Sequence, residues 1–324
     1  MNKAVKIWLI VASALVLVGT ITFLGVMSAM GWNFLRLSTE KYETNKHEIS
    51  EDFEDISIKT DTSDIVFLLS NDEKCRVECY ESQKAKHSVT VKGLTLDIAV
   101  VNERKWYDNI YIGFSSAPKI KVYLPKGEYE ELYVKASTGR LELPEELGFE
   151  SMDISLSTGD VFCYSSAKKD IIIKTSTGDI EIENIYAGAL DLNSSTGKIK
   201  ASNIDCKGDT ILTVTSGKAI LSDIKCKDLI SKGSTGDIVL SDVISSGKFD
   251  IRRVTGYVSF DGCDAAEIYV TTDTGDVKGN LLSEKIFIPT TDTGDVDVPK
   301  TVTGGRCEIT TDTGDIKISI RAGE

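Results

Sequence analysis

The chain has 324 residues and carries 50 Asp and Glu against 37 Lys and Arg, which gives a formal net charge of −13 at pH 7. Such an acidic chain is a poor candidate for nucleic-acid binding, because phosphate recognition needs a basic surface. With 26 glycines and 5 prolines, the composition is neither collagen-like nor typical of a disordered chain.

Residues 7–30 contain no charged residue. A helix of this length would span about 36 Å, which is enough to cross a bilayer. The apolar core of a cleaved signal peptide is shorter, about 7–15 residues, and the small-x-small site that follows it is missing before Gly31. We therefore predict one uncleaved transmembrane helix within an anchor of residues 1–35. Basic residues flank both ends of the run, so charge alone does not decide its orientation.

Residues 36–52 are polar and are predicted to form a short stalk between the anchor and the first strands. The chain has only two histidines, His47 and His87, and they are far apart in sequence. We expect both to be solvated on the surface, which disfavours a catalytic or metal site built on histidine.

Residues 53–131 keep the alternation of strands but show no fixed period. A solenoid needs atypical end coils to stop further edge pairing, so this segment is predicted to be an N-terminal cap. Within it, Asp61-Thr62-Ser63-Asp64 resembles the corner of the repeat described next, with Ser63 in place of glycine. Three aromatic residues also gather here: Trp106, Tyr107 and Tyr111. We expect them to plug the end of the core, with stacking on sugar rings as the alternative.

Residues 132–324 contain ten copies of Thr-Gly or Ser-Gly, spaced by 19 or 20 residues. The ten glycines are Gly139, Gly159, Gly178, Gly197, Gly217, Gly236, Gly256, Gly275, Gly294 and Gly314. A period near 20 indicates stacked coils, each of which buries its apolar face only against its neighbours.

Apolar and polar residues alternate on both sides of each glycine, as in Leu190 and Leu192 before a corner and Leu141 and Leu143 after one. This period of two indicates strands with one buried face. Glycine suits the corner because it tolerates positive φ. The predicted fold is all-β, a single-stack parallel β-solenoid of about ten coils of 19–20 residues. Each coil would run as strand, Thr-Gly corner, strand and return loop, with neighbouring coils about 4.8 Å apart.

The alternation continues through Ile316, Ile318 and Ile320, almost to the C-terminus, with no obvious capping helix after it. We therefore expect an open end formed by the last coil of the sequence. An uncovered sheet edge is a surface at which two copies can self-associate.

Aspartate follows the corner glycine in six coils, and the last three copies read Thr-Asp-Thr-Gly-Asp. Stacking these three would gather six carboxylates: Asp273, Asp276, Asp292, Asp295, Asp312 and Asp315. Oxygen-rich clusters can hold Ca²⁺, but the spacing does not match the calcium nonapeptide repeat. An Asp that hydrogen-bonds nearby backbone in a turn is a sufficient structural explanation. We favour the structural role and keep calcium as the alternative.

No other group of residues predicts a catalytic centre or a cofactor. Asp-Thr-Gly also occurs in aspartic proteases, but here it recurs at the period of the repeat. The one local break in the pattern is Arg252 and Arg253, beside the coil in which Tyr257 follows the glycine. Carbohydrate-active enzymes also use β-solenoids, and paired carboxylates are plentiful, so an enzyme of that class stays an alternative.

The chain has seven cysteines, and none has the Cys-x-x-Cys spacing of a zinc site. Cys206 and Cys226 each lie nine residues after their corner glycine, so they should stack in adjacent coils at a spacing that permits a disulfide. Cys75 and Cys79 lie about 13 Å apart on an extended strand, too far to pair with each other. The cysteines do not settle the compartment.

With these motifs in view, the chain resembles the "putative adhesin" β-solenoid family of bacterial envelope proteins. The resemblance rests on repeated Ser-Thr-Gly-Asp corners, ending at Asp160, Asp179 and Asp237, and covers roughly residues 50–320 together with the N-terminal anchor. It implies a Gram-positive, membrane-anchored protein whose solenoid lies outside the cell. It supplies no functional residues. Other residues replace this Asp at Arg140, Lys198, Lys218 and Tyr257, which interrupts any continuous ladder of carboxylates.

Three functions follow as hypotheses. The first is a non-enzymatic envelope protein that presents an acidic rod for adhesion or for assembly with a cell-wall polymer or an envelope protein. The second is a regulatory or stress-sensing accessory of another membrane protein, and the third is a carbohydrate-active enzyme. Function has to be argued from a site rather than from the fold, and the repeat offers a surface without an evident site.

Overall fold

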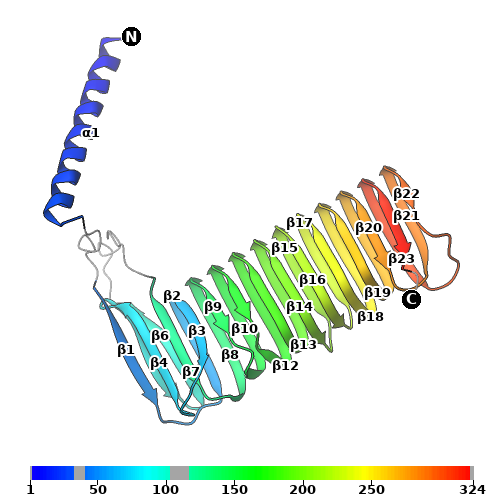
Figure 1. The fold of residues 1–324 in the computed structure, drawn as a ribbon, viewed down its shortest axis with the longest axis horizontal. Coiled ribbons are helices and arrows are strands. Elements are labelled where there is room, and N and C mark those ends of the chain that lie inside the picture. The colour runs from blue at the N-terminus through cyan, green and yellow to red at the C-terminus, as the bar shows by residue number, and fades with distance from the viewer. Residues whose placement is uncertain (1, 33–40, 103–116, 322–324) are drawn as a thin grey trace.

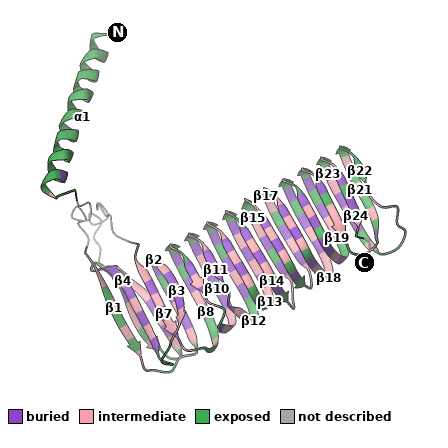
Figure 2. Ribbon diagram, viewed as in Figure 1, coloured by how far each residue is buried: buried purple, intermediate pink, exposed green. Residues whose placement is uncertain are grey.

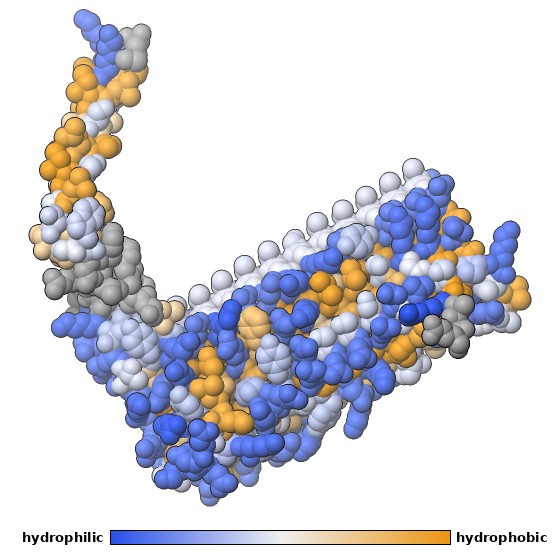
Figure 3. Space-filling view, in the orientation of Figure 1, coloured by the Kyte–Doolittle hydropathy of each residue, from blue (hydrophilic) through white to orange (hydrophobic). Residues whose placement is uncertain are grey.

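The computed structural model describes residues 2–32, 41–102 and 117–321. Within these described residues there is one helix, α1 (Lys3–Ala29), followed by a long stack of strands (Figure 1). The helix is long and apolar enough to cross a membrane, and none of its most apolar window is buried, so its surface is largely hydrophobic (Figure 3). The aromatic residues Trp106, Tyr107 and Tyr111 lie outside the described residues.

Antiparallel strands form the N-terminal end of the stack. They are β1 (Tyr42–Ile49), β4 (Cys75–Ser82), β5 (Ala85–Lys92), β6 (Thr95–Asn102) and β7 (Lys119–Leu124). Strand β4 pairs with both β1 and β7, and β5 pairs with β6. The predicted stalk is therefore wrong for residues 42–49, which pair with β4 along their whole length. Their alternation was hidden because half-buried positions such as Asn45 and His47 are polar.

The first parallel coil lies inside the segment that was predicted to be cap. Strands β2 (Asp55–Thr62) and β3 (Asp64–Leu69) pair in register with β8 (Gly127–Thr138) and β9 (Leu141–Leu143). Ser63 occupies the corner between them, and its carbonyl lies against Gly139. The similarity of this segment to a repeat corner is thus confirmed. On the other side of this coil, β6 pairs in parallel with β2, and β7 pairs in parallel with β3. These two strands therefore connect the parallel stack to the antiparallel strands β4 and β5.

The remaining strands stack in parallel and confirm the β-solenoid (Figure 1). Their bounds are β10 (Leu147–Thr158), β11 (Val161–Cys163), β12 (Ser166–Thr177), β13 (Ile180–Thr196), β14 (Ile199–Cys206), β15 (Thr210–Ser216), β16 (Ala219–Cys226), β17 (Leu229–Thr235), β18 (Ile238–Thr255), β19 (Val258–Thr274), β20 (Val277–Leu281), β21 (Lys285–Thr293), β22 (Val296–Asp297), β23 (Gly305–Thr313) and β24 (Ile316–Ile320). Buried and solvent-facing residues alternate along each strand, so the core runs through the stack as continuous columns of apolar side chains (Figure 2).

Five consecutive coils in the middle of the stack have a second corner that the sequence analysis missed. Six residues after the glycine, the backbone adopts a left-handed conformation at Asn184, Asn203, Asp223, Asp242 and Gly262. Asn and Asp tolerate this region better than other side chains, and Gly has no steric cost there. The predicted return loop therefore turns at this position and continues as strand, which explains why β13 runs through it for 17 residues.

The last two coils of the sequence exchange places in the stack. Strand β23 pairs with β19 on one side and β21 on the other, and β24 likewise lies between β20 and β22. The corner glycines therefore stack in the order Gly275, Gly314, Gly294. Figure 1 shows β23, in red, inside the stack and β21 and β22, in orange, at its tip. The prediction that residues 316–320 form the open end is wrong, because residues 285–298 form it.

Proline and glycine account for this order. Pro289 has no N–H group, so it suits an edge strand such as β21 and would remove a ladder hydrogen bond from a central one. The chain returns into the stack through Gly304 and Gly305, where a Cβ would lie within 2 Å of the carbonyl oxygens of Glu284 and Ala266. Only glycine permits so close an approach of two backbones. These three residues are the sequence signal for the exchange.

Candidate functional site

The corner glycines form a row in which each residue packs on the backbone of the preceding coil. Gly197 has φ of +150°, and a Cβ there would lie 2.1 Å from the carbonyl oxygen of Gly178. The hydroxyls of Thr175 and Ser194 donate to the carbonyls of Gly159 and Gly178 across the same step. The predicted corner role of the ten glycines is consistent with this stacking, and it leaves no space at the corner for a side chain.

The aspartates that follow these glycines bind backbone N–H groups in the neighbouring coil. Asp179 Oδ1 accepts from the N–H of Lys198 at 2.7 Å, and Asp160 Oδ1 accepts from that of Asp179 at 2.9 Å. The same bond recurs where Asp237 meets Tyr257 and where Asp276 meets Asp315. The favoured structural role of these aspartates is therefore seen in the geometry.

The six carboxylates proposed as a calcium patch do fall in neighbouring coils, but in the exchanged order. Asp276 and Asp315 each pair at 2.7 Å with a lysine two residues on, Lys278 and Lys317. These hydrogen bonds lower the pKa of both carboxyl groups, with bonds from backbone N–H groups adding to the effect. Binding of Ca²⁺ would have to displace both lysines. Calcium binding at Asp273, Asp276, Asp292, Asp295, Asp312 and Asp315 stays a prediction.

Arg252 and Arg253, where the repeat pattern is interrupted, have different surroundings: Arg252 is on the surface and Arg253 is in the core. Arg252 pairs with Asp250, whereas Arg253 is buried and fills the space over Gly233, where a Cβ would lie 2.1 Å from its guanidinium. Arg253 donates to Ser231 at 2.8 Å, and burial lowers its pKa to about 10. Its guanidinium is thus enclosed, and Gly233 is the small residue that accommodates it.

All seven cysteines are buried free thiols. Cys206 and Cys226 occupy equivalent inward positions of neighbouring coils, as the spacing predicted, but no bond joins them. Burial raises the pKa of the Cys226 thiol to about 12. Cys75 and Cys79 share the inward face of β4 and are likewise unpaired with each other.

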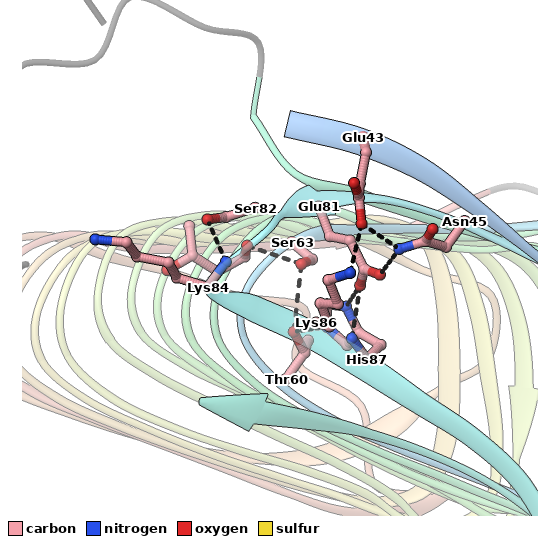
Figure 4. Close-up of polar contacts among 10 residues, drawn as sticks. Glu43, Asn45, Thr60, Ser63, Glu81, Ser82, Lys84, Lys86 and His87 are labelled. Carbon is pink, nitrogen blue, oxygen red and sulfur yellow. Dashed lines mark hydrogen bonds and ion pairs between the residues drawn. The ribbon is translucent and has the colours of Figure 1, made fainter. Parts of the chain in front are cut away.

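A buried polar network joins four strands of the cap (Figure 4). Glu81 on β4 accepts from the side chain of Asn45 on β1 at 2.6 Å and from the backbone N–H of His87 on β5 at 2.6 Å. The His87 ring lies with Nδ1 2.7 Å from Glu81 and Nε2 2.9 Å from the Thr60 hydroxyl on β2. Since His87 is 7% exposed, the prediction that it is a solvated surface residue is wrong.

The sequence signal for this network was available but weak. Glu81 continues the inward-facing positions of Cys75, Val77 and Cys79 at a period of two, so its burial could be read from β4. A buried carboxylate requires hydrogen-bonding partners. Those partners come from three other strands, and no local spacing in the sequence predicts that they meet.

Comparison with known proteins gives the family. The family model "Toastrack DUF4097" matches residues 53–218 and 207–323. The chain belongs to the Toastrack family. This confirms the resemblance that the repeated corners indicated, and the activity of the family is not defined by the match.

Several solved structures are similar to this Toastrack chain. A "putative lipid binding protein" from Parabacteroides distasonis shares 14% identity, with a TM-score of 0.47, over 87% of this chain and 98% of its own. A "putative adhesin" from Bacteroides fragilis shares 14% at a TM-score of 0.38, over 86% and 97%. Another from Parabacteroides distasonis shares 13% at 0.42, over 86% and 98%. No curated protein matches the chain.

One lateral face of the Toastrack solenoid carries a mixed row of side chains, which we call the outer column. It consists of the outward residue six positions before each corner glycine. In stacked order the members are Tyr133, Asp153, Ile172, Asp191, Ile211, Ile230, Asp250, Tyr269, Glu308 and Ile288. A shallow groove of about 360 Å³ lies along it between Ile172 and Ile211. Carboxylates, aliphatic groups and phenol rings thus alternate at the spacing of the coils.

Proposed function

We propose that the protein is a non-enzymatic, single-pass membrane protein of the cell envelope whose solenoid binds a cell-wall polymer or another envelope protein. Helix α1 would hold it in the membrane, with the solenoid outside the cell. The observation that carries the proposal is the outer column, a long and regular array of outward-facing, at least partly exposed groups on a rigid scaffold. An array of this kind suits a partner that is itself extended or repetitive.

The chemistry of the outer column supports a partner with both apolar and hydrogen-bonding groups. Tyr133 and Tyr269 offer ring faces that can stack on apolar or sugar surfaces. Asp153 and Asp191 offer acceptors for hydroxyl or ammonium groups. The strands behind the column fix the spacing of these groups, so little side-chain and backbone entropy is lost on binding. The net charge of −13 favours partners that are neutral or basic where they touch the solenoid.

Co-sedimentation with purified cell-wall polymer tests the proposal. A soluble fragment of residues 36–324 is compared with the double variant Ile172→Ser and Ile211→Ser, which alters the groove of the outer column. The control is Ile220→Ser with Val239→Ser, a pair of outward residues on the next face of the stack. We expect the groove variant to bind about tenfold more weakly, or about 1.4 kcal/mol, while the control binds like the parent.

Other outcomes would favour the alternatives. Shortening of the polymer during the assay, abolished by replacing one or two carboxylates, would identify a carbohydrate-active enzyme. Capture of a membrane protein by the full-length chain, without wall binding by the fragment, would favour a sensing accessory that acts through α1. Equal weakening by the groove and control variants would overturn the assignment of the binding face.

A further inference from the structure

We propose that Cys79, Glu81 and His87 in the cap form a binding site for a divalent transition-metal ion, and that Zn²⁺ is the cation that fits them best. The three side chains are buried, and their sulfur, oxygen and nitrogen ligand atoms all lie within 4.8 Å of one another. Across residues 2–32, 41–102 and 117–321, no other three ligand-type side chains converge in this way. Thiolate, carboxylate and imidazole are the ligands that Zn²⁺ takes in proteins, and three of them leave a fourth position for water.

The fold brings these ligands together on one hairpin. Cys79 and Glu81 are two residues apart on β4, so both point into the cap. A short turn joins β4 to β5, with Ser82 paired to Ala85, and brings Nδ1 of His87 to 2.7 Å from the Glu81 carboxylate. Thr60 on β2 and Asn45 on β1 contact His87 and Glu81, so these two ligands are held in place before any metal arrives.

Two further residues are positioned as outer partners of the ligands. A metal-binding histidine usually donates its second ring N–H to a neighbouring acceptor, which fixes the tautomer and the ring. His87 directs Nδ1 toward Glu81, and its Nε2 lies 2.9 Å from the Thr60 hydroxyl, which can accept that N–H. Asn45 holds Glu81 through Oε1, so Oε2 is the oxygen that faces His87 and would face the metal.

The charges also match a divalent cation. Glu81 contributes one negative charge, and the Cys79 thiolate contributes a second, so their sum with Zn²⁺ is zero. Without a metal, burial raises the pKa of the Cys79 thiol to about 12, and the nearby Glu81 adds to the effect. Binding therefore breaks the S–H bond, forms a metal–sulfur bond and releases one proton to solvent. A neutral buried site avoids the cost of an uncompensated charge.

A small cavity adjoins the His87 side of the site. It has a volume of about 80 Å³ and is lined by Thr60, Ser63, Ser82 and His87. This volume is enough for a water molecule next to the His87 ring, since one water occupies about 30 Å³. His87 lies on both the cavity and the ligand cluster and so connects the two.

The test uses Co²⁺ as a spectroscopic substitute for Zn²⁺ in the full-length protein, purified in detergent without metal. Cys79→Ser removes the proposed sulfur ligand. Cys75→Ser is the matched control, because Cys75 lies on the same face of β4, is also buried and also has a pKa raised to about 12 by burial. We expect one Co²⁺ per chain with a sulfur-to-metal charge-transfer band, present in the parent and in Cys75→Ser and absent in Cys79→Ser.

Thermal unfolding gives an independent readout with Zn²⁺. The parent and the Cys75→Ser control should gain melting temperature on addition of Zn²⁺ and lose it with a chelator, whereas Cys79→Ser and His87→Gln should not respond. His87→Gln keeps a hydrogen-bonding side chain beside Glu81, so it separates loss of a ligand from loss of folding. Absence of the charge-transfer band in the parent, or equal bands in both cysteine variants, would overturn the proposal.

Discussion

At the scale of single residues, the solenoid depends on positions where a side chain would occupy the same space as the neighbouring coil. Gly197 combines φ of +150° with a Cβ position 2.1 Å from the carbonyl of Gly178. Neither strain nor contact can be relieved without separating the two coils. The Thr-Gly repeat is therefore a packing requirement that recurs once per coil.

Gly197→Ala should lower the free energy of unfolding by about 2–4 kcal/mol, because it adds both backbone strain and a clash with the backbone of the neighbouring coil. Gly127→Ala is the matched control, since nothing lies within 4 Å of a Cβ there and its φ is not in the left-handed region. It should change stability by no more than about 0.5 kcal/mol. Denaturant unfolding of both variants checks this, and equal stability would show that the corner tolerates a side chain.

The carboxylates at the corners predict that the stability of the protein depends on pH in the acidic range. The pKa values of Asp276 and Asp315 are lowered in the folded state by Lys278 and Lys317. The two carboxylates therefore contribute to the free energy of unfolding above the unfolded-state pKa of about 3.9. This contribution is lost as the pH falls through their lower folded-state pKa values. Both groups are partly exposed to solvent, so screening keeps the effect on stability small.

We expect the melting temperature to fall between about pH 5 and pH 3, and to fall less in the double variant Lys278→Met and Lys317→Met. The variant removes the partners that lower the two pKa values, while other carboxylates that titrate in this range are unchanged. Differential scanning calorimetry at several pH values measures both curves. Parallel curves would mean that these pairs contribute nothing to the acid response.

The residue scale also shows how far the sequence predicts the site. The alternation and the glycine spacing predicted the buried columns, because these depend on local periods. The network around Glu81 could not be predicted, because Asn45, Thr60 and His87 reach it from three separate strands. Polar residues at inward positions of β1 and β5 look like surface residues until the partner strands are known.

At the scale of elements, the exchanged order of the last two coils is the main departure from a simple reading of the repeat. The repeat spacing fits either order, because both place one corner glycine over another. Pro289 favours β21 as the edge strand, and the Gly304-Gly305 pair lets the chain re-enter the stack, so these residues determine the order of the two coils. The repeat period therefore predicts the strands and the corner of each coil, whereas individual proline and glycine residues determine the position of a coil in the stack.

Thiol cross-linking distinguishes the two orders. Lys278 is the neighbour of Lys317 in the structure, whereas in sequence order it would be the neighbour of Asp297. A short cross-linker should join cysteines placed at 278 and 317, which are about one coil spacing of 4.8 Å apart. It should not join cysteines at 278 and 297. The native thiols are buried and should react slowly. The reverse result would restore the sequence order of the coils.

At the scale of the whole molecule, the protein is a rigid acidic stack joined to an apolar helix. The all-β solenoid and the position of the helix in the chain could be predicted from the sequence, because repeat period and hydropathy are properties of long segments. The family was indicated by the resemblance of the repeated Ser-Thr-Gly-Asp corners and is confirmed by the family match. The boundary of the cap was not, since Ser63 replaces glycine and the cap strands carry polar inward residues. Adhesion, anchoring and the outward placement of the solenoid stay proposals.

The most direct test of the account is the location of the solenoid in intact cells. We expect the full-length protein to stay with the membrane through alkaline extraction, to keep residues 7–30 in its mature form, and to lose the solenoid to external protease once the wall is removed. A fragment of residues 36–324 should be released as a soluble protein. A mature chain that begins after residue 30, or a solenoid that is digested only after lysis, would contradict the proposal of an anchored, outward-facing envelope protein.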